Sequence, residues 1–117
     1  MKLIITGGLG YQFTPGDIAS LDSLHSTRRV TEVVSGKAPG ADACGEAWAR
    51  KNGLPVTWFP ANWVKHGRTA SQRQNQLISG YADAMALFPG GSVTENMRKL
   101  ARSTGMELFD FCPSEEV

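Results

Sequence analysis

The stretch ADAMALFPGGSVTE at positions 82–95 joins an apolar run, a glycine pair and the start of a helix. The apolar run predicts a buried strand, and Ser92 and Glu95 have the spacing of a capping box. Residues at helical spacing follow them: Met97, Leu100, Ala101 and Thr104. This combination predicts an anion site, because the first N–H groups of a helix and the positive end of its dipole attract phosphate. A plain turn before a capped helix fits the same residues.

The rest of the chain alternates strands with helices. We expect strands at 3–6, 31–35, 55–59, 83–88 and 106–109, and helices at 15–25, 41–52, 70–81 and 93–104. Thr14 caps the first helix, with Pro15 at its first position and Asp17 at its third. The alternation predicts an α/β fold, a Rossmann-like three-layer sandwich with a parallel sheet of about five strands. Strand 3–6 should be central, because it and strand 83–88 are the most continuously apolar.

Two helices have a predicted inner face. In the first helix the inner residues are Ile18, Leu21, Leu24 and His25. In the second helix they are Ala43, Ala47 and Trp48.

Composition limits the classes of protein. At 117 residues, 12.6 kDa and 41% hydrophobic content, residues 1–117 fit a single domain. A net charge of +1 without a basic run makes nucleic acid an unexpected partner. Cys44 and Cys112 have no metal-ligand spacing, so no disulfide framework, metal or cofactor is expected. Without a signal peptide or a long apolar stretch, we expect a soluble cytoplasmic protein that has no membrane partner.

Polar and glycine-rich loops follow the predicted strands at 7–11, 35–42, 60–73 and 89–95. In parallel sheets a ligand lies beyond the carboxyl ends of the strands, where these loops converge. Glycines dominate the rim: Gly7, Gly8, Gly36, Gly40, Gly90 and Gly91. A rim with few side chains favours a ligand that binds to backbone, such as a phosphate or a nucleotide.

Two standard nucleotide motifs are rejected. The pattern G-x-G-x-x-G begins at Gly8, but Phe13 takes the third glycine position, which argues against a nicotinamide dehydrogenase. Gly36-Lys37 lacks the preceding glycine of a Walker motif, which argues against a P-loop NTPase.

Four blocks occur in the order and spacing of a known family. They are SGKAPGAD at 35–42, FPANW at 59–63, NQ at 75–76 and FPGG at 88–91. From residue 4 to about 108 the chain resembles the small, single-domain YspA-like proteins of the SLOG superfamily, named for the Smf/DprA and LOG proteins. The resemblance implies a Rossmann-like fold that binds nucleotide-derived ligands. It also implies a possible activity, since members resembling LOG hydrolyse the N-glycosidic bond of nucleoside monophosphates.

Departures from the family pattern bear on that activity. Leu9 stands where the family often has arginine, and Val93 replaces the third glycine of P-G-G-x-G-T. LOG-type hydrolysis is associated with a glutamate in P-G-G-x-G-T-x-x-E, and Met97 occupies that position here. The resemblance therefore favours binding over hydrolysis.

The predicted ligand-binding residues come from all four loops. They are Gly7, Gly8, Tyr11, Ser35, Gly36, Lys37, Ala38, Gly40, Asp42, Asn62, Arg68, Arg73, Asn75, Pro89, Gly90, Gly91, Ser92 and Thr94. Asp42 fits a ribose contact or a helix N-cap equally well, and Tyr11 fits base stacking or simple packing. Lys37, Arg68 and Arg73 are candidate phosphate contacts. Asp42 and Glu95 are the weak candidates for a catalytic acid.

Three functions remain open. The first, which we favour, is the binding of a nucleotide or an ADP-ribose-like ligand by a sensor or a sequestering protein. The second is a LOG-like phosphoribohydrolase, which would need a carboxylate near the ribose C1. The third is an interaction module whose glycine loops no longer hold a ligand. In each case a homo-oligomer, a dimer or larger, is expected.

Overall fold

The computed structural model describes residues 1–36, 39–58 and 80–112. The elements in chain order are β1 (Lys2–Thr6), α1 (Pro15–Arg28), β2 (Glu32–Ser35), α2 (Ala41–Lys51), β3 (Val56–Trp58), β4 (Ala84–Leu87), α4 (Gly91–Thr104) and β5 (Glu107–Asp110). The expected helix at 70–81 lies outside the described residues except for Gly80 and Tyr81, which are helical.

The strands form one parallel sheet in the order β3-β2-β1-β4-β5. The chain first moves outward through β2 and β3, and it then crosses β1 to form β4 and β5. The order therefore reverses at β1, and the loops after β1, β2 and β4 lie beside that switch point. The prediction of a parallel sheet with β1 at its centre is confirmed.

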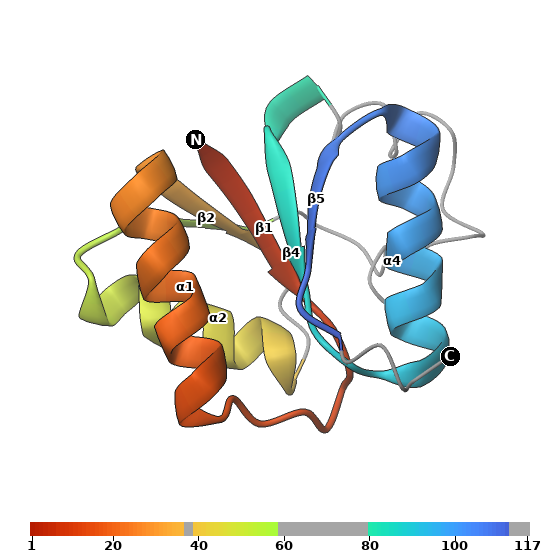
Figure 1. Ribbon diagram of the computed structural model, residues 1–117, viewed down its shortest axis with the longest axis horizontal. Coiled ribbons are helices and arrows are strands. Elements are labelled where there is room, and N and C mark those ends of the chain that lie inside the picture. Colours follow the sequence, from red (N-terminus) through yellow and green to blue (C-terminus); the bar gives the residue numbers. More distant parts are fainter. Residues whose placement is uncertain (37–38, 59–79, 113–117) are drawn as a thin grey trace.

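Both faces of the sheet are covered, which gives a three-layer α/β sandwich (Figure 1). Leu3 and Ile5 of β1 pack in one core with residues of α1 and α2, whereas Ile4 packs in a second core with residues of α4. This alternation follows from the two-residue period of a strand. These three side chains are fully buried, and each contributes about 1.5–3 kcal/mol to folding by leaving water.

Helix α1 begins with its own side-chain cap. The Thr14 hydroxyl accepts from the Asp17 N–H at 3.1 Å, and the Asp17 carboxylate accepts from the Thr14 N–H at 2.9 Å. Pro15 occupies the first helical position, as predicted. Leu21 and Leu24 are buried as expected, but Ile18 is 37% exposed, so its place on the inner face was wrong.

Helix α2 presents a different face to the sheet from the predicted one. Ala43 and Ala47 are exposed, while Trp48 is buried as expected. The reason is Gly45, where an added Cβ would lie 2.6 Å from the Ile5 side chain. Because α2 lies against β1 at this glycine, the residues on its inner face are Ala41, Asp42, Gly45, Trp48 and Ala49.

In the described part of the chain, no helix is long and apolar enough to cross a bilayer.

Candidate functional site

The first, second and fourth loops meet at the carboxyl edge of the sheet. Gly8 N–H donates to the Pro89 carbonyl at 3.0 Å, and the Gly8 carbonyl accepts from Ala41 N–H at 3.1 Å. Gly8, in the loop after β1, is therefore bonded both to the loop after β4 and to the start of α2. The expected convergence of these three loops is confirmed.

The closest approach is between Gly8 and Gly90. An added Cβ on Gly8 would lie 2.7 Å from the Gly90 Cα and 2.8 Å from the Pro89 carbonyl oxygen. Separations this short are essentially never made by real Cβ atoms, so only glycine allows the two backbones to touch. Gly7 is confined in the same way, with an added Cβ 2.7 Å from the Phe88 carbonyl oxygen. These glycines have a packing role that the sequence interpretation did not separate from ligand binding.

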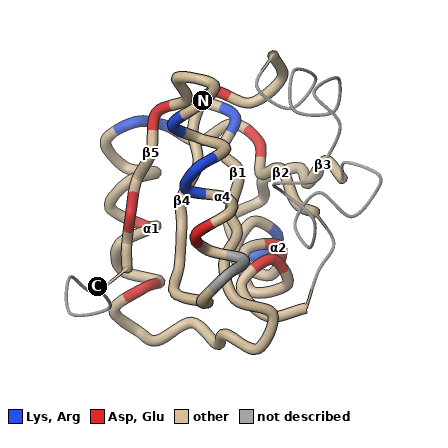
Figure 2. The backbone as a smooth tube through the Cα atoms, turned by 90° about the vertical axis from the view of Figure 1, so that its right-hand side faces the viewer, with Lys and Arg blue, Asp and Glu red and all other residues tan. Residues whose placement is uncertain are grey.

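An open groove of about 450 Å³ lies on this contact. It is lined by the first and fourth loops: Gly8, Leu9, Gly10, Tyr11, Pro89, Gly90 and Gly91. None of these described lining residues is charged, and Figure 2 shows the loops along the lower edge of the molecule mostly in tan. The volume falls within the roughly 300–1,000 Å³ of small-molecule sites.

Gly91 differs from its neighbours, because nothing lies within 4 Å of an added Cβ there. Its φ of 62° is in the left-handed region that favours glycine. Gly91 is the first residue of α4, so the start of this helix borders open space in the groove.

The start of α4 is not the predicted capping box. The N-cap is Gly90, which makes no side-chain cap, and Ser92 is already the second helical residue. The Glu95 carboxylate instead accepts from Arg98 at 2.5 Å. The prediction was wrong because the contact of Gly90 with Gly8 starts the helix earlier, and because Arg98 competes for Glu95.

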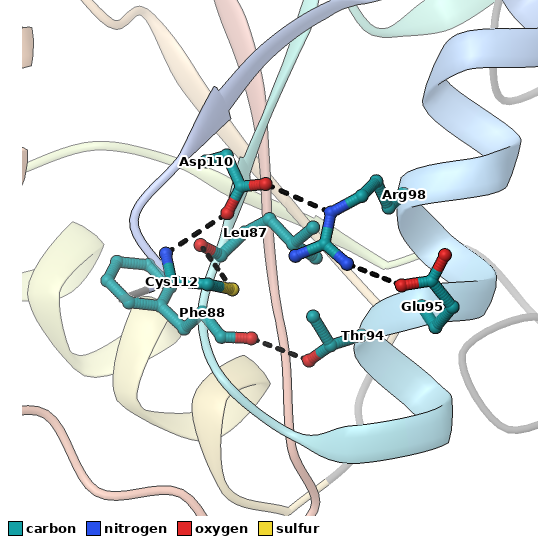
Figure 3. A network of polar contacts seen from close by, with 7 residues as sticks. All are labelled: Leu87, Phe88, Thr94, Glu95, Arg98, Asp110 and Cys112. Carbon is teal, nitrogen blue, oxygen red and sulfur yellow. Dashed lines mark hydrogen bonds and ion pairs between the residues drawn. The ribbon is translucent and has the colours of Figure 1, made fainter. Parts of the chain in front are cut away.

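Thr94 fastens this helix start to the sheet. Its side chain is 3% exposed, and its hydroxyl donates to the Phe88 carbonyl at 2.6 Å (Figure 3). Thr94 thus holds the loop between β4 and α4 in place through its bond to Phe88. A direct contact between Thr94 and a ligand stays a prediction.

Arg98 connects α4 to β5 (Figure 3). Its guanidinium donates from Nε to Asp110 at 2.9 Å, besides its bond to Glu95. Partial burial raises the pKa of Asp110, but the hydrogen bonds from Arg98 and from Cys112 outweigh it, so this pKa lies below its usual value. The pKa of Arg98 is raised above its usual value, mainly by the hydrogen bond to Asp110. Glu95, one of the two catalytic candidates, is therefore part of a structural ion-pair cluster.

Asp42, the other catalytic candidate, is 1% exposed. It is the second residue of α2 and not the N-cap, which is Gly40. Its carboxylate accepts from the Thr6 hydroxyl at 3.0 Å and from the Gly36 N–H at 3.2 Å. Asp42 thereby ties the end of β1 and the loop after β2 to the start of α2, a role that its position in the sequence did not indicate.

Ser35 and Tyr11 also have partners within the protein. The Ser35 hydroxyl donates to Glu46 at 2.7 Å. The Tyr11 hydroxyl donates to Asp17 at 2.6 Å, and its ring stacks on Phe88 at a centroid distance of 6.0 Å. Tyr11 therefore packs within the protein and also lines the groove, and a contact between its ring and a base stays a prediction.

Several predicted ligand contacts lie outside the described residues: Lys37, Ala38, Asn62, Arg68, Arg73 and Asn75. Their roles stay predictions. Within the described residues, no group of His, Cys, Asp or Glu has an arrangement that could hold a metal ion.

Comparisons with known proteins place this chain in a family. Residues 1–66 match the model of the YspA, cpYpsA-related SLOG family (YAcAr). The chain is also similar to the Gene 61 protein of Mycobacterium phage D29, with 34% identity over 101 residues, which cover 80% of this chain and 81% of that protein. No solved structure is a significant match to the chain.

Proposed function

The chain belongs to the YspA, cpYpsA-related SLOG family, and from that membership we propose that it binds a nucleotide or a nucleotide-derived ligand such as a nucleoside phosphate or an ADP-ribose-like molecule. The protein would act as a sensor of that ligand or would sequester it. The observation that carries the proposal is the groove, which is lined mainly by glycines and is bordered by Gly91, the first residue of α4.

The proposed phosphate position is the first turn of α4. A helix leaves its first N–H groups without intrahelical partners, and its dipole places positive potential there. Nothing lies within 4 Å of a Cβ added at Gly91, and the N-cap of the helix is Gly90, which makes no side-chain cap. A phosphate bound there would satisfy backbone donors without needing a charged side chain from the described lining.

The contacts of the two candidate carboxylates favour binding without rapid chemistry. Asp42 is buried and accepts bonds from Thr6 and Gly36, and Glu95 is paired with Arg98. Met97, at the position of the LOG glutamate, is fully buried and packs in the core between α4 and the sheet. A phosphoribohydrolase remains the alternative, and it would have to free one of these two carboxylates.

Thermal unfolding in the presence of ligands tests the proposal. AMP, ADP-ribose and cyclic dinucleotides would each be added to the purified protein, with adenosine as the control that lacks phosphate. A ligand at about 100 times its dissociation constant adds roughly 2.7 kcal/mol to the free energy of unfolding, which is a clear shift of the melting temperature. We expect phosphate-bearing ligands to give this shift and adenosine to give less. No shift with any of them would contradict the proposal.

Product analysis separates binding from hydrolysis. We expect incubation with AMP, other nucleoside monophosphates or ADP-ribose to release no free base above the uncatalysed background. Release of base that disappears in Asp42→Asn or Glu95→Gln would establish the hydrolase instead.

A homo-oligomeric state and a cytoplasmic location are further parts of the proposal. Light scattering of the protein at two concentrations would test the first of these.

A further inference from the structure

The first loop brings apolar side chains to the groove that Gly91 of α4 also lines. Leu9 lines it in the first loop and is 37% exposed, although a leucine side chain is usually buried. Single exposed apolar residues are common, but this one stands on the rim of a groove whose other lining residues are mainly glycine. A ligand in the groove would remove Leu9 from water.

The neighbouring aromatic wall is rigid. Tyr11 is held at both ends, by its hydroxyl bond to Asp17 and by the stacking of its ring on Phe88. Phe13 also packs on Phe88 at a centroid distance of 4.6 Å. Leu9 thus lines the groove together with an aromatic residue that does not have to be ordered by the ligand, which lowers the entropic cost of binding.

The two loops that line the groove differ in chemistry. The loop after β4 brings Gly91, which offers backbone and the positive end of a helix dipole. The loop after β1 brings Leu9 and Tyr11, which offer apolar and aromatic surface. A nucleotide has the same division, with an anionic phosphate at one end and a flat base with apolar faces at the other.

We propose that Leu9 is a specificity-determining residue that contacts the base of the ligand, so that the ligand class is a nucleoside phosphate and not a sugar phosphate. This inference rests on the proposed function, since it orients the same ligand in the same groove. Leu9 should not distinguish one base from another, because it would contact the face of the ring and not its hydrogen-bonding edge.

Calorimetric titration with two kinds of probe tests the proposal. The nucleoside monophosphates AMP, GMP, CMP and UMP carry a base, and ribose 5-phosphate carries the same sugar and phosphate without one. We expect Leu9→Ser to weaken binding of the best nucleoside monophosphate about tenfold, while affinity for ribose 5-phosphate changes less than about twofold.

Two further variants control for side effects. Ile18→Ser removes an equally exposed apolar side chain, since Ile18 is also 37% exposed, from a position on α1 outside the groove. It should leave all affinities unchanged. Leu9→Met keeps apolar surface in the first loop and should retain most of the preference for nucleoside monophosphates.

The possible outcomes distinguish a failure of the role of Leu9 from a failure of the proposed nucleotide binding. If nucleoside monophosphates bind but Leu9→Ser leaves their advantage over ribose 5-phosphate intact, or weakens both probes equally, the role of Leu9 is wrong and the proposed function stands. If no nucleotide binds to the unchanged protein, both fail.

Discussion

Helices α1 and α4 begin at the same edge of the molecule, yet their first turns are completed in different ways. Helix α1 closes its own start, because Thr14 and Asp17 exchange hydrogen bonds across the first turn. Helix α4 begins at a glycine pair, and its nearest acidic side chain, Glu95, turns to Arg98. A self-capped helix start has little left to offer a ligand, whereas an uncapped start beside an open groove retains its donors and its dipole.

The close contact between Gly8 and Gly90 holds the α4 start in place, and a substitution there should cause the largest loss of stability. Gly8→Ala would place a methyl group 2.7 Å from the Gly90 Cα, where only backbone could move to relieve it. We expect a loss of about 3 kcal/mol in the free energy of unfolding, measured by urea denaturation. Gly10→Ala is the matched control, because nothing lies within 4 Å of its added Cβ, and it should change stability by less than about 0.5 kcal/mol. Equal effects of the two substitutions would argue against the close packing of the loops.

A smaller loss is expected at Thr94. Thr94→Val keeps the shape of this buried side chain but removes the hydroxyl that donates to Phe88. The carbonyl then loses its partner, which should cost about 2 kcal/mol in urea denaturation. Thr104→Val is the control, because that hydroxyl bonds only within its own helix and is half-buried. A Thr94→Val protein as stable as the unchanged one would show that the α4 start does not depend on this bond.

Loss of the α1 cap should lower stability without affecting ligand binding. Thr14→Ala removes the side chain that accepts from Asp17 N–H and should cost about 1 kcal/mol of stability. Affinity for AMP should not change, because the α1 start lies outside the groove. A parallel loss of stability and of AMP affinity would contradict the assignment of separate roles to the two helix starts.

The smallest effect is the pH dependence of the bond between α4 and β5. Since the pKa of Asp110 is lowered in the folded protein, its contribution is fully present above the ordinary aspartate pKa and is lost as the pH falls through the lower, folded value. Because this side chain is 35% exposed, we expect the contribution to be only about 0.5 kcal/mol. Asp110→Asn should therefore lower stability at pH 7 and have almost no effect near pH 2. An equal deficit at both values would show that the ion pair is not its cause.

The sequence was sufficient for the features that depend on local pattern. Continuous apolar runs identified β1 and β4 as inner strands, and Thr14, Pro15 and Asp17 located the start of α1. These predictions are correct because the hydrophobic pattern and the helix cap both depend on residues that are close together in the sequence.

Long-range contacts account for what was missed. The S-x-x-E spacing at Ser92 predicted a cap that the Gly8–Gly90 contact and the Arg98 ion pairs displace. The inner face of α2 depends on the fit of Gly45 against Ile5, and the alanines spread along this helix do not indicate which side faces the sheet. Asp42 was equally ambiguous, because its partners Thr6 and Gly36 are brought to it only by the fold.

The central claim is that a ligand phosphate binds at the start of α4 and not at the start of α1. Calorimetric titration of AMP into Gly91→Asp and Gly16→Asp tests it most directly, because each variant adds one carboxylate to one helix start. Added Cβ atoms meet no close neighbour at Gly91 and only ordinary contact, at 3.6 Å, at Gly16, and aspartate tolerates the left-handed φ of Gly91 better than most residues. Gly91→Asn has the same shape without the charge and should retain part of the affinity. We predict that Gly91→Asp folds but no longer binds AMP, while Gly16→Asp binds as the unchanged protein does; unchanged AMP affinity in a folded Gly91→Asp protein would contradict the claim.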